Sequence, residues 1–515
     1  MNKGGCKHCP GCFSKSYWLE QTISPFPPMI EDERTEVGVI GGGIVGIMTA
    51  YLLSKAGKKV VLVEGNQMLR GVTGHTTAKI SAQHGLIYDT LIQTFGERVA
   101  RLYYEANLEG LALIQDTSQQ LAIACGFEIK ESVVFASSER TVQKIEAEAR
   151  AYETLEIDGV LSYGSLDDLP FPVDAALIMR HQAQFHPVQF LSPLLAEIEK
   201  LGGLIYENTR ATHLSKDGSV VYMENGAHLT CDQVVVATHY PFNDFNGLYL
   251  SKLSIERSYL LAAKVSETVP QAMYLSADSP SRSLRSVTDS EGSDWLLIGG
   301  DNHQTGKSKA PTRTHYDNLE AFGRRWFGLE QVPFRWSAQD MTTLDQVPYI
   351  GQMVASSENV YVATGFNKWG MAMGALAGKL ITDLILDQPN RYKDLFDPLR
   401  SKIKSADIKA FTKKNTSVAK DLVMTTLQKP ELTLEELKSD EGGLVAIDGK
   451  KYGGYRDVDG ELHVVKTTCT HLGCGLRWND AERSWDCACH GSRFSYKGDV
   501  LNGPAVKPLE KIDIE

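Results

Sequence analysis

The sequence predicts an α/β body that combines a Rossmann-like unit with an interleaved α+β domain, followed by a small all-β domain. Residues 36–65 read as a strand, a glycine turn, a helix and a second strand, which is the βαβ pattern. Residues 359–386 return to a strand, a glycine turn and a helix. After residue 428 the chain consists of short strands separated by glycine turns, which is typical of an all-β domain.

The length of 515 residues predicts about two to four domains. We expect a poorly structured tail with a cysteine cluster, the body, a Lys/Ser/Thr-rich linker and the all-β domain, which occupy residues 1–30, 31–398, 399–428 and 429–515. Within the body, periodicity predicts helices over 88–118, 138–154, 186–203 and 314–328. Strands are expected over 127–137, over 233–238 and within 253–300.

Composition excludes several classes of protein. Hydrophobic residues make up 42% and charged residues 23%, as in folded globular chains. The net charge is −11 and no block of Lys or Arg stands out, so nucleic-acid binding is not expected. The uncharged stretch 37–54 approaches membrane length, but its three adjacent glycines, 41–43, favour a strand, a tight turn and a helix over a transmembrane segment. Without a secretory signal, we expect a cytoplasmic protein.

The C-terminal region carries two short groups of metal-ligand residues. Cys469 and His471 form a C-x-H pair, and Cys487 and His490 form a C-x-x-H pair further along. Two thiolates and two imidazoles suit a [2Fe–2S] cluster with Cys₂ on one iron and His₂ on the other. A structural zinc site also accepts this ligand set, although it leaves two neighbouring cysteines unexplained.

Residues 430–515 resemble a Rieske domain of the disulfide-containing, respiratory type. The resemblance implies a [2Fe–2S] cluster on the four ligands and a disulfide between Cys474 and Cys489. It also implies that the Ser492 hydroxyl donates to a cluster sulfide and that the loop 502–504 covers the cluster. Family members of high potential carry a tyrosine where this chain has Phe494, so one hydrogen bond to a ligand sulfur is missing and a lower potential is expected.

The first βαβ unit carries a dinucleotide-binding pattern. Gly41, Gly43 and Gly46 form a G-x-G-x-x-G turn between strand and helix, so a pyrophosphate can meet the backbone at Gly43, Ile44 and Val45. Glu64 ends the next strand, where its carboxylate can accept a hydrogen bond from a ribose hydroxyl. This pattern alone does not distinguish FAD from NAD.

Four later segments resemble the glycine oxidase, D-amino-acid oxidase and sarcosine oxidase superfamily, which implies FAD. Segment 72–85 resembles its second flavin-contacting loop, and segments 345–351 and 363–374 resemble its C-terminal flavin signature. Segment 234–241 resembles its strand-end ATG element, with His239 in the usual glycine position. The resemblance implies flavin contacts at Gly74, Thr76, Thr77, Ala237, Gly365, Asn367, Gly370 and Met371.

Other candidate residues have a functional and a structural interpretation. His75 and Lys79 lie where sarcosine oxidase-like enzymes place a His and an Arg beside the flavin, so they are candidate catalytic residues; alternatively Lys79 bonds only phosphate or backbone carbonyls. The histidines His84, His186 and His239 are expected to be structural or exposed. The arginines Arg257, Arg282 and Arg285 could clamp a carboxylate, but ion pairs are the expected role.

The N-terminal cysteines form an incomplete metal motif. Cys6, Cys9 and Cys12, with His8, match three thiolates of a ferredoxin run without its final cysteine, so an unstructured thiol-bearing tail is the default interpretation.

The whole chain resembles an FAD-dependent oxidoreductase fused to a Rieske domain. The expected function is an amine or amino-acid dehydrogenase that passes electrons from flavin to the cluster and on to an unidentified acceptor. An electron conduit or reductase with electrons entering at the Rieske centre, and a redox sensor, remain alternatives.

Overall fold

The computed structural model describes residues 14–514, except 244–246, 309, 401–421, 423–424, 426–427 and 431. The cysteine cluster of the tail and most of the expected linker therefore lie outside the described residues.

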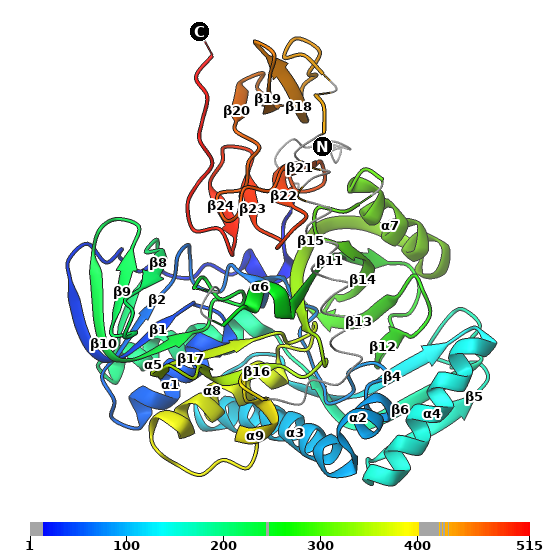
Figure 1. Ribbon diagram of the computed structural model, residues 1–515. Helices are drawn as coiled ribbons and strands as arrows, with labels where there is room; N and C mark the ends of the chain where they lie inside the picture. The colour runs from blue at the N-terminus through cyan, green and yellow to red at the C-terminus, as the bar shows by residue number, and fades with distance from the viewer. Residues whose placement is uncertain are drawn as a thin grey trace.

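A mainly parallel sheet forms the Rossmann-like part of the body (Figure 1). Its strands run in the order β16 (Tyr349–Val354), β17 (Ser357–Thr364), β10 (His228–Val236), β1 (Glu33–Ile40), β2 (Val60–Val63) and β7 (Leu204–Tyr206), with β8 (Ala211–Leu214) and β9 (Val220–Met223) paired beside β10. The pairs of β1 with β2 and β10 are parallel, as a βαβ unit requires. The carboxyl ends of these strands therefore share one edge.

Helices cover this sheet. The helix α1 (Ile44–Lys55) is buried along almost its whole length, in contact with α5 (Pro187–Lys200) and α8 (Ala372–Ile385). The expected helix 88–118 is two helices, because Gly96 has a φ of +88° and ends α2 (Tyr88–Phe95) before α3 (Glu97–Gln120) begins. The remaining helices of the body are α4 (Glu139–Leu155), α6 (Tyr249–Lys252), α7 (Arg313–Phe327) and α9 (Lys393–Phe396).

A second, mixed sheet forms the interleaved domain. Its strand order is β15 (Leu329–Thr343), β11 (Leu253–Val265), β14 (Asp294–Gln304), β13 (Arg282–Thr288), β12 (Met273–Ser276), β4 (Glu128–Ala136), β6 (Ala175–Gln184) and β3 (Lys79–Ile80), with β5 (Gly159–Tyr163) paired to β6. The chain passes between the two sheets several times, so neither sheet is one continuous segment. This is the interleaved arrangement that the sequence predicted.

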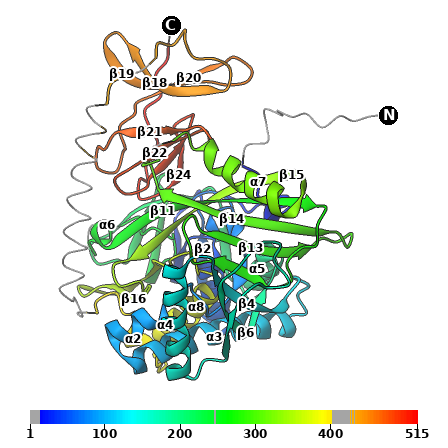
Figure 2. The same cartoon turned by 90° about the vertical axis from the view of Figure 1, so that its right-hand side faces the viewer.

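The C-terminal domain stands on the body as two small antiparallel sheets (Figures 1 and 2). The outer sheet contains β18 (Glu441–Ile447), β19 (Lys450–Arg456) and β20 (Leu462–Val465). The inner sheet contains β21 (Leu476–Asn479), β22 (Ser484–Cys487), β23 (Arg493–Ser495) and β24 (Val500–Asn502), and it lies between the outer sheet and the body.

The described end of the N-terminal segment is more ordered than the sequence predicted. Residues Tyr17–Glu20 form a 3₁₀ helix that Ser16 caps, and Trp18 is completely buried. The indole N–H of Trp18 donates to the Thr76 carbonyl at 2.7 Å. The nearby prolines suggested a loose tail, but burial of this indole fixes the segment to the body. Among the described helices, none has the length and apolar character needed to cross a membrane.

Candidate functional site

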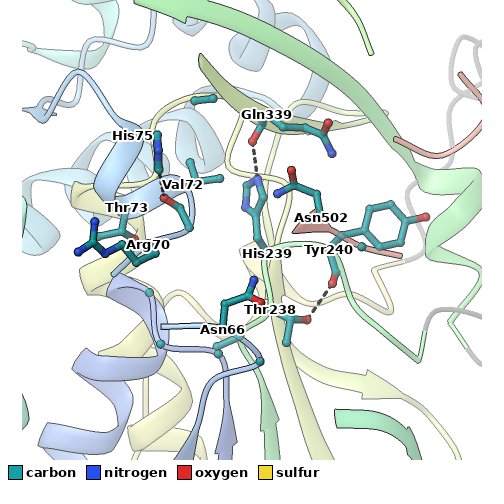
Figure 3. A pocket seen from close by; sticks show the side chains of 18 of the residues that line it. Asn66, Arg70, Val72, Thr73, His75, Thr238, His239, Tyr240, Gln339 and Asn502 are labelled. Atoms are coloured by element: carbon teal, nitrogen blue, oxygen red, sulfur yellow. Dashed lines mark hydrogen bonds between the residues drawn. The ribbon is translucent and has the colours of Figure 1, made fainter. Parts of the chain in front are cut away.

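A cavity of about 550 Å³ opens where the carboxyl edge of the first sheet meets strand β15 and the C-terminal domain (Figure 3). The glycine turn Gly41–Val45 forms one wall of this cavity. The segment around His75 and the strand residues around Gln339 form two more. Residues 501–503, 505 and 506 of the C-terminal domain close it, so both halves of the chain contribute to one cavity.

The glycine turn is shaped so that backbone, not side chain, faces the cavity. A Cβ on Gly41, whose φ is +120°, would overlap the Ala237 carbonyl, and a Cβ on Gly46 would overlap the Gly41 carbonyl. A Cβ on Gly43 would lie 3.1 Å from the Thr73 hydroxyl oxygen. The turn opens α1, whose first N–H groups have no acceptor within the helix, so those other than the Ile44 N–H, which donates to Thr73, are donors suited to a pyrophosphate.

Two side chains hold the turn in place. The carboxylate of Glu64 accepts hydrogen bonds from the N–H of Gly42 and of Asn66, both at 2.8 Å. Burial raises the pKa of Glu64, and these two N–H donors lower it. The carboxylate retains acceptor capacity for a ribose hydroxyl. The Thr73 hydroxyl accepts from the Ile44 N–H at 3.0 Å. Sequence reasoning missed Thr73, although it lies inside the segment 72–85.

Nine of the fourteen expected cofactor residues line the cavity: Gly41, Gly43, Ile44, Val45, Glu64, Thr76, Ala237, Gly370 and Met371. The other five shape its surroundings. Gly46 and Gly74 permit close backbone packing, and Gly365 has a φ of +80°. The Thr77 carbonyl accepts from Arg285, and the Asn367 side-chain oxygen accepts from the Thr342 hydroxyl at 2.8 Å.

The two candidate catalytic residues lie in different environments. His75 lines the cavity, where its Nδ1 is 2.8 Å from the Gly71 carbonyl oxygen, and desolvation lowers the pKa of its ring. Lys79 is not among the lining residues: its Nζ donates to the Tyr274 carbonyl and the Ser283 hydroxyl, both at 2.7 Å. Burial lowers the pKa of Lys79 to about 7. These contacts match the structural alternative for Lys79.

Of the three histidines expected to be structural or exposed, one lines the cavity and two have structural contacts. His239 lines the cavity and adopts a φ of +63°, which explains how it occupies a position typical of glycine. Its Nε2 is 2.9 Å from the Gln339 carbonyl oxygen (Figure 3). His84 lies against Tyr103 and the Ser81 carbonyl, and burial lowers its pKa to about 3. His186 accepts from the Gln189 N–H at the start of α5.

The three candidate arginines have partners within the chain. Arg282 pairs with Asp301 at 3.1 Å, and Arg285 donates to buried carbonyls, including Ala78 at 2.8 Å. Arg257 lines the cavity and pairs with Glu482 of the C-terminal domain at 3.3 Å. The expectation of structural ion pairs thus holds for Arg257 and Arg282, while Arg285 binds backbone carbonyls.

Two matched turns carry the four metal-ligand candidates. In the first, the Gly473 N–H donates to the Cys469 carbonyl at 3.0 Å; in the second, the Gly491 N–H donates to the Cys487 carbonyl at 3.1 Å. Both glycines have a positive φ, +75° and +74°. A disulfide between Cys474 and Cys489 joins the two turns, with a Cα–Cα distance of 6.6 Å.

The side chains on these turns converge. Cys469 and Cys487 are buried and not disulfide-bonded, and the pKa of Cys469 is lowered by its hydrogen bonds with Cys487 and with the Ser492 hydroxyl. The rings of His471 and His490 lie 5.1 Å apart between centroids. Two neighbouring thiols and two neighbouring imidazoles, carried by the same two turns, form a donor set whose chemistry fits a [2Fe–2S] cluster with mixed ligation.

Two further residues border this set. The Ser492 hydroxyl oxygen accepts from the Ala505 N–H at 3.0 Å. This bond joins the turn 487–491, called the cluster turn below, to the loop that also lines the cavity. Phe494 is completely buried in the same apolar cluster as Cys469 and Cys487.

Comparisons with known proteins assign both halves of the chain. The family model described as FAD dependent oxidoreductase matches residues 36–384, and the Rieske [2Fe-2S] domain model matches residues 429–513. The protein YhfW of Bacillus subtilis, named as a Rieske 2Fe-2S iron-sulfur protein, is 43% identical over 97% of this chain and 98% of its own length.

Two further matches cover the body. Gamma-glutamylputrescine oxidoreductase of Escherichia coli is 21% identical over 72% of this chain and 88% of its own length. The crystal structure of glycine oxidase from Geobacillus kaustophilus superposes with a TM-score of 0.59, at 18% identity, over 72% of this chain and 99% of that one. This structural likeness supports the fold.

Proposed function

Since the chain belongs to the FAD dependent oxidoreductase family and carries a C-terminal Rieske [2Fe-2S] domain, we propose that it is an amine or amino-acid dehydrogenase whose flavin passes electrons to the Rieske cluster. Its cofactors are FAD and a [2Fe–2S] cluster. FAD supplies two-electron oxidation of a C–H bond, and the cluster accepts one electron at a time.

The shared cavity is the observation that carries this proposal. Gly41–Val45 of the body and Asn502–Gly503 of the C-terminal domain line the same space. The loop at 503–505 is also bonded to Ser492, beside the cluster turn. A cluster site that shares a wall with the flavin cavity is suited to exchange electrons with the flavin directly.

Each cofactor has a proposed set of residues. The pyrophosphate meets the backbone at Gly43–Val45, and Glu64 accepts from the ribose. Cys469, His471, Cys487 and His490 ligate the cluster. His75, which lines the cavity and whose pKa is lowered by desolvation, is the proposed group beside the reacting part of the flavin. Lys79 has a positioning role, since its Nζ holds strands β12 and β13.

The substrate class rests on the relatives. Gamma-glutamylputrescine oxidoreductase and glycine oxidase are named for an amine and an amino acid. Their likeness to this body favours a donor with a C–H bond next to nitrogen. The electron acceptor outside the chain is an unidentified one-electron carrier.

An anaerobic screen tests the proposal. Amino acids and secondary amines are added to the holoprotein, while the flavin absorbance band and the electron paramagnetic resonance signal of the reduced cluster are followed. A substrate should bleach the flavin and reduce the cluster together. In a Cys487→Ser variant that retains FAD, the same substrate should still bleach the flavin without the cluster signal. Bleaching in the wild type with a permanently oxidised cluster would contradict the proposed electron path.

A further inference from the structure

The turn of the C-terminal domain that carries Cys487 and His490 packs directly against the body. Gly306, two residues after the end of β14, has a φ of +69°, and a Cβ there would lie 2.7 Å from the Ala488 nitrogen and 2.9 Å from its Cα. On the other side, a Cβ on Gly491 would lie 2.7 Å from Ile255 and 3.1 Å from the Gln339 amide nitrogen. The backbone at Gly306 is therefore packed directly against the backbone of the turn, and the turn residue Gly491 is packed against body side chains.

Gln339 joins this turn to the cavity wall. Its Nε2 donates to the Gly491 carbonyl at 2.8 Å, and its Oε1 accepts from the Thr305 hydroxyl at 3.1 Å. Its backbone carbonyl oxygen is the atom 2.9 Å from Nε2 of His239 (Figure 3). Gln339 is 2% exposed, and both it and His239 line the cavity. A single residue thus contacts the cluster turn and the flavin cavity.

Other interdomain bonds hold the same orientation. The Thr312 N–H donates to the Asp480 carboxylate at 2.7 Å, and the Tyr316 hydroxyl donates to Glu482 at 2.7 Å. With the Arg257–Glu482 pair, they fix the inner sheet of the C-terminal domain against β11 and α7. Because these contacts are spread over several elements, the C-terminal domain is held in one defined position on the body.

We propose that Gly306 and Gln339 are positioning residues that seat the cluster turn against the cavity wall for electron transfer from the flavin. The inference rests on the proposed function. Each substrate oxidation yields two electrons, which pass one at a time to the cluster and reduce one iron from the ferric to the ferrous state. An external one-electron carrier removes each electron before the next, and the two protons go to water.

Flash photoreduction tests the positioning role of Gly306 and Gln339 and needs no known substrate. Holoprotein is flashed in the flavin band with EDTA as the electron donor, and the rate at which electrons appear on the cluster is recorded. Gly306→Ala places a methyl group against the Ala488 backbone and must displace the turn. Gly292→Ala is the matched control, because Gly292 also has a positive φ, +80°, but has no atom within 4 Å of the added Cβ. Gln339→Leu removes the amide donor at similar volume.

We expect transfer to be slower in Gly306→Ala and in Gln339→Leu than in the wild type, because displacing the turn lengthens the path over which electrons tunnel and the rate of tunnelling falls steeply with distance. Gly292→Ala should match the wild type. Flavin, iron and sulfide contents should be equal in all four proteins. Amide hydrogen exchange over 487–491 should be faster only in Gly306→Ala and Gln339→Leu, and this measurement does not depend on activity.

The outcomes separate the two proposals. No transfer in the wild type contradicts the proposed function itself. The positioning role is overturned, while the proposed function stands, if Gly306→Ala and Gln339→Leu transfer electrons at the wild-type rate. It is also overturned if their amide hydrogen exchange over 487–491 equals that of Gly292→Ala.

Discussion

In the buried ion pair Arg257–Glu482, which joins the body to the C-terminal domain, we expect removal of the two partners to cost unequal amounts of stability. Both side chains are nearly inaccessible, at 3% and 6% exposure, with an N–O distance of 3.3 Å. Glu482 has a second partner in the Tyr316 hydroxyl and a more distant one in Arg493 at 3.9 Å. The Nε and Nη1 of Arg257 find no acceptor within the described part of the chain. Removing Glu482 should therefore cost more than removing Arg257.

The magnitude follows from this geometry. At 3.3 Å and an effective dielectric constant of about 20, the attraction is about 5 kcal/mol. Removing one partner of a buried pair costs about 3–5 kcal/mol, because the other charge remains uncompensated. Burial and the charge of Arg493 already lower the pKa of Arg257, so Glu482→Gln should fall in that range. Arg257→Met removes a poorly satisfied cation and leaves Glu482 with two partners, so about 1–3 kcal/mol is expected.

Equilibrium urea denaturation of the wild type, the two single variants and the double variant measures these free energies of unfolding. FAD is kept in excess so that its contribution to stability is the same in all four proteins. The double variant should be more stable than the sum of the single changes predicts, by roughly 2 kcal/mol. The reasoning is refuted if Arg257→Met destabilises the protein as much as Glu482→Gln, or if the two effects simply add.

Four further predictions follow from individual sites. Gly43→Val pushes a side chain against Thr73 and into the cavity, so flavin occupancy should fall; full occupancy would place the pyrophosphate elsewhere. Burial lowers the pKa of Lys79 in the folded protein to about 7, so between about pH 7 and pH 10 the unfolded chain binds a proton that the folded chain has released. The wild type should therefore gain stability relative to Lys79→Met as the pH rises through that range. A stability difference between the two proteins that does not change with pH would contradict this. Purified protein should contain about two iron and two sulfide per chain, whereas zinc without sulfide would indicate the structural alternative. Phe494→Tyr should raise the cluster potential, by at most roughly 60–130 mV for one added hydrogen bond, and Ser492→Ala should lower it; an electrochemical titration in which Phe494→Tyr has no effect would show that residue 494 does not face a ligand sulfur.

The parts of the fold that the sequence predicts are those encoded by neighbouring residues. The glycine turn at Gly41, the acidic end of β2 at Glu64 and the two Cys/His turns each lie within a few residues, so their spacing is visible in one dimension. The helix break at Gly96 and the burial of Trp18 were not predicted. Helical periodicity continues through Gly96, and the partners of Trp18 lie more than fifty positions away.

The connection between the two cofactor sites depends on contacts that no local pattern encodes. Gln339 contacts Gly491 from 152 positions away, and Arg257 meets Glu482 across 225. Both body residues lie on strands whose alternation predicts only a face, and a carboxylate for Arg257 could have come from any of the 64 acidic residues. The position of the C-terminal domain on the body decides the partner, and that position is held by close packing of Gly306 on the Ala488 backbone and of Gly491 on the side chains of Ile255 and Gln339. Substitutions at Gly306 should therefore slow electron transfer between the two cofactor sites without changing the content of either cofactor, although Gly306 belongs to neither motif.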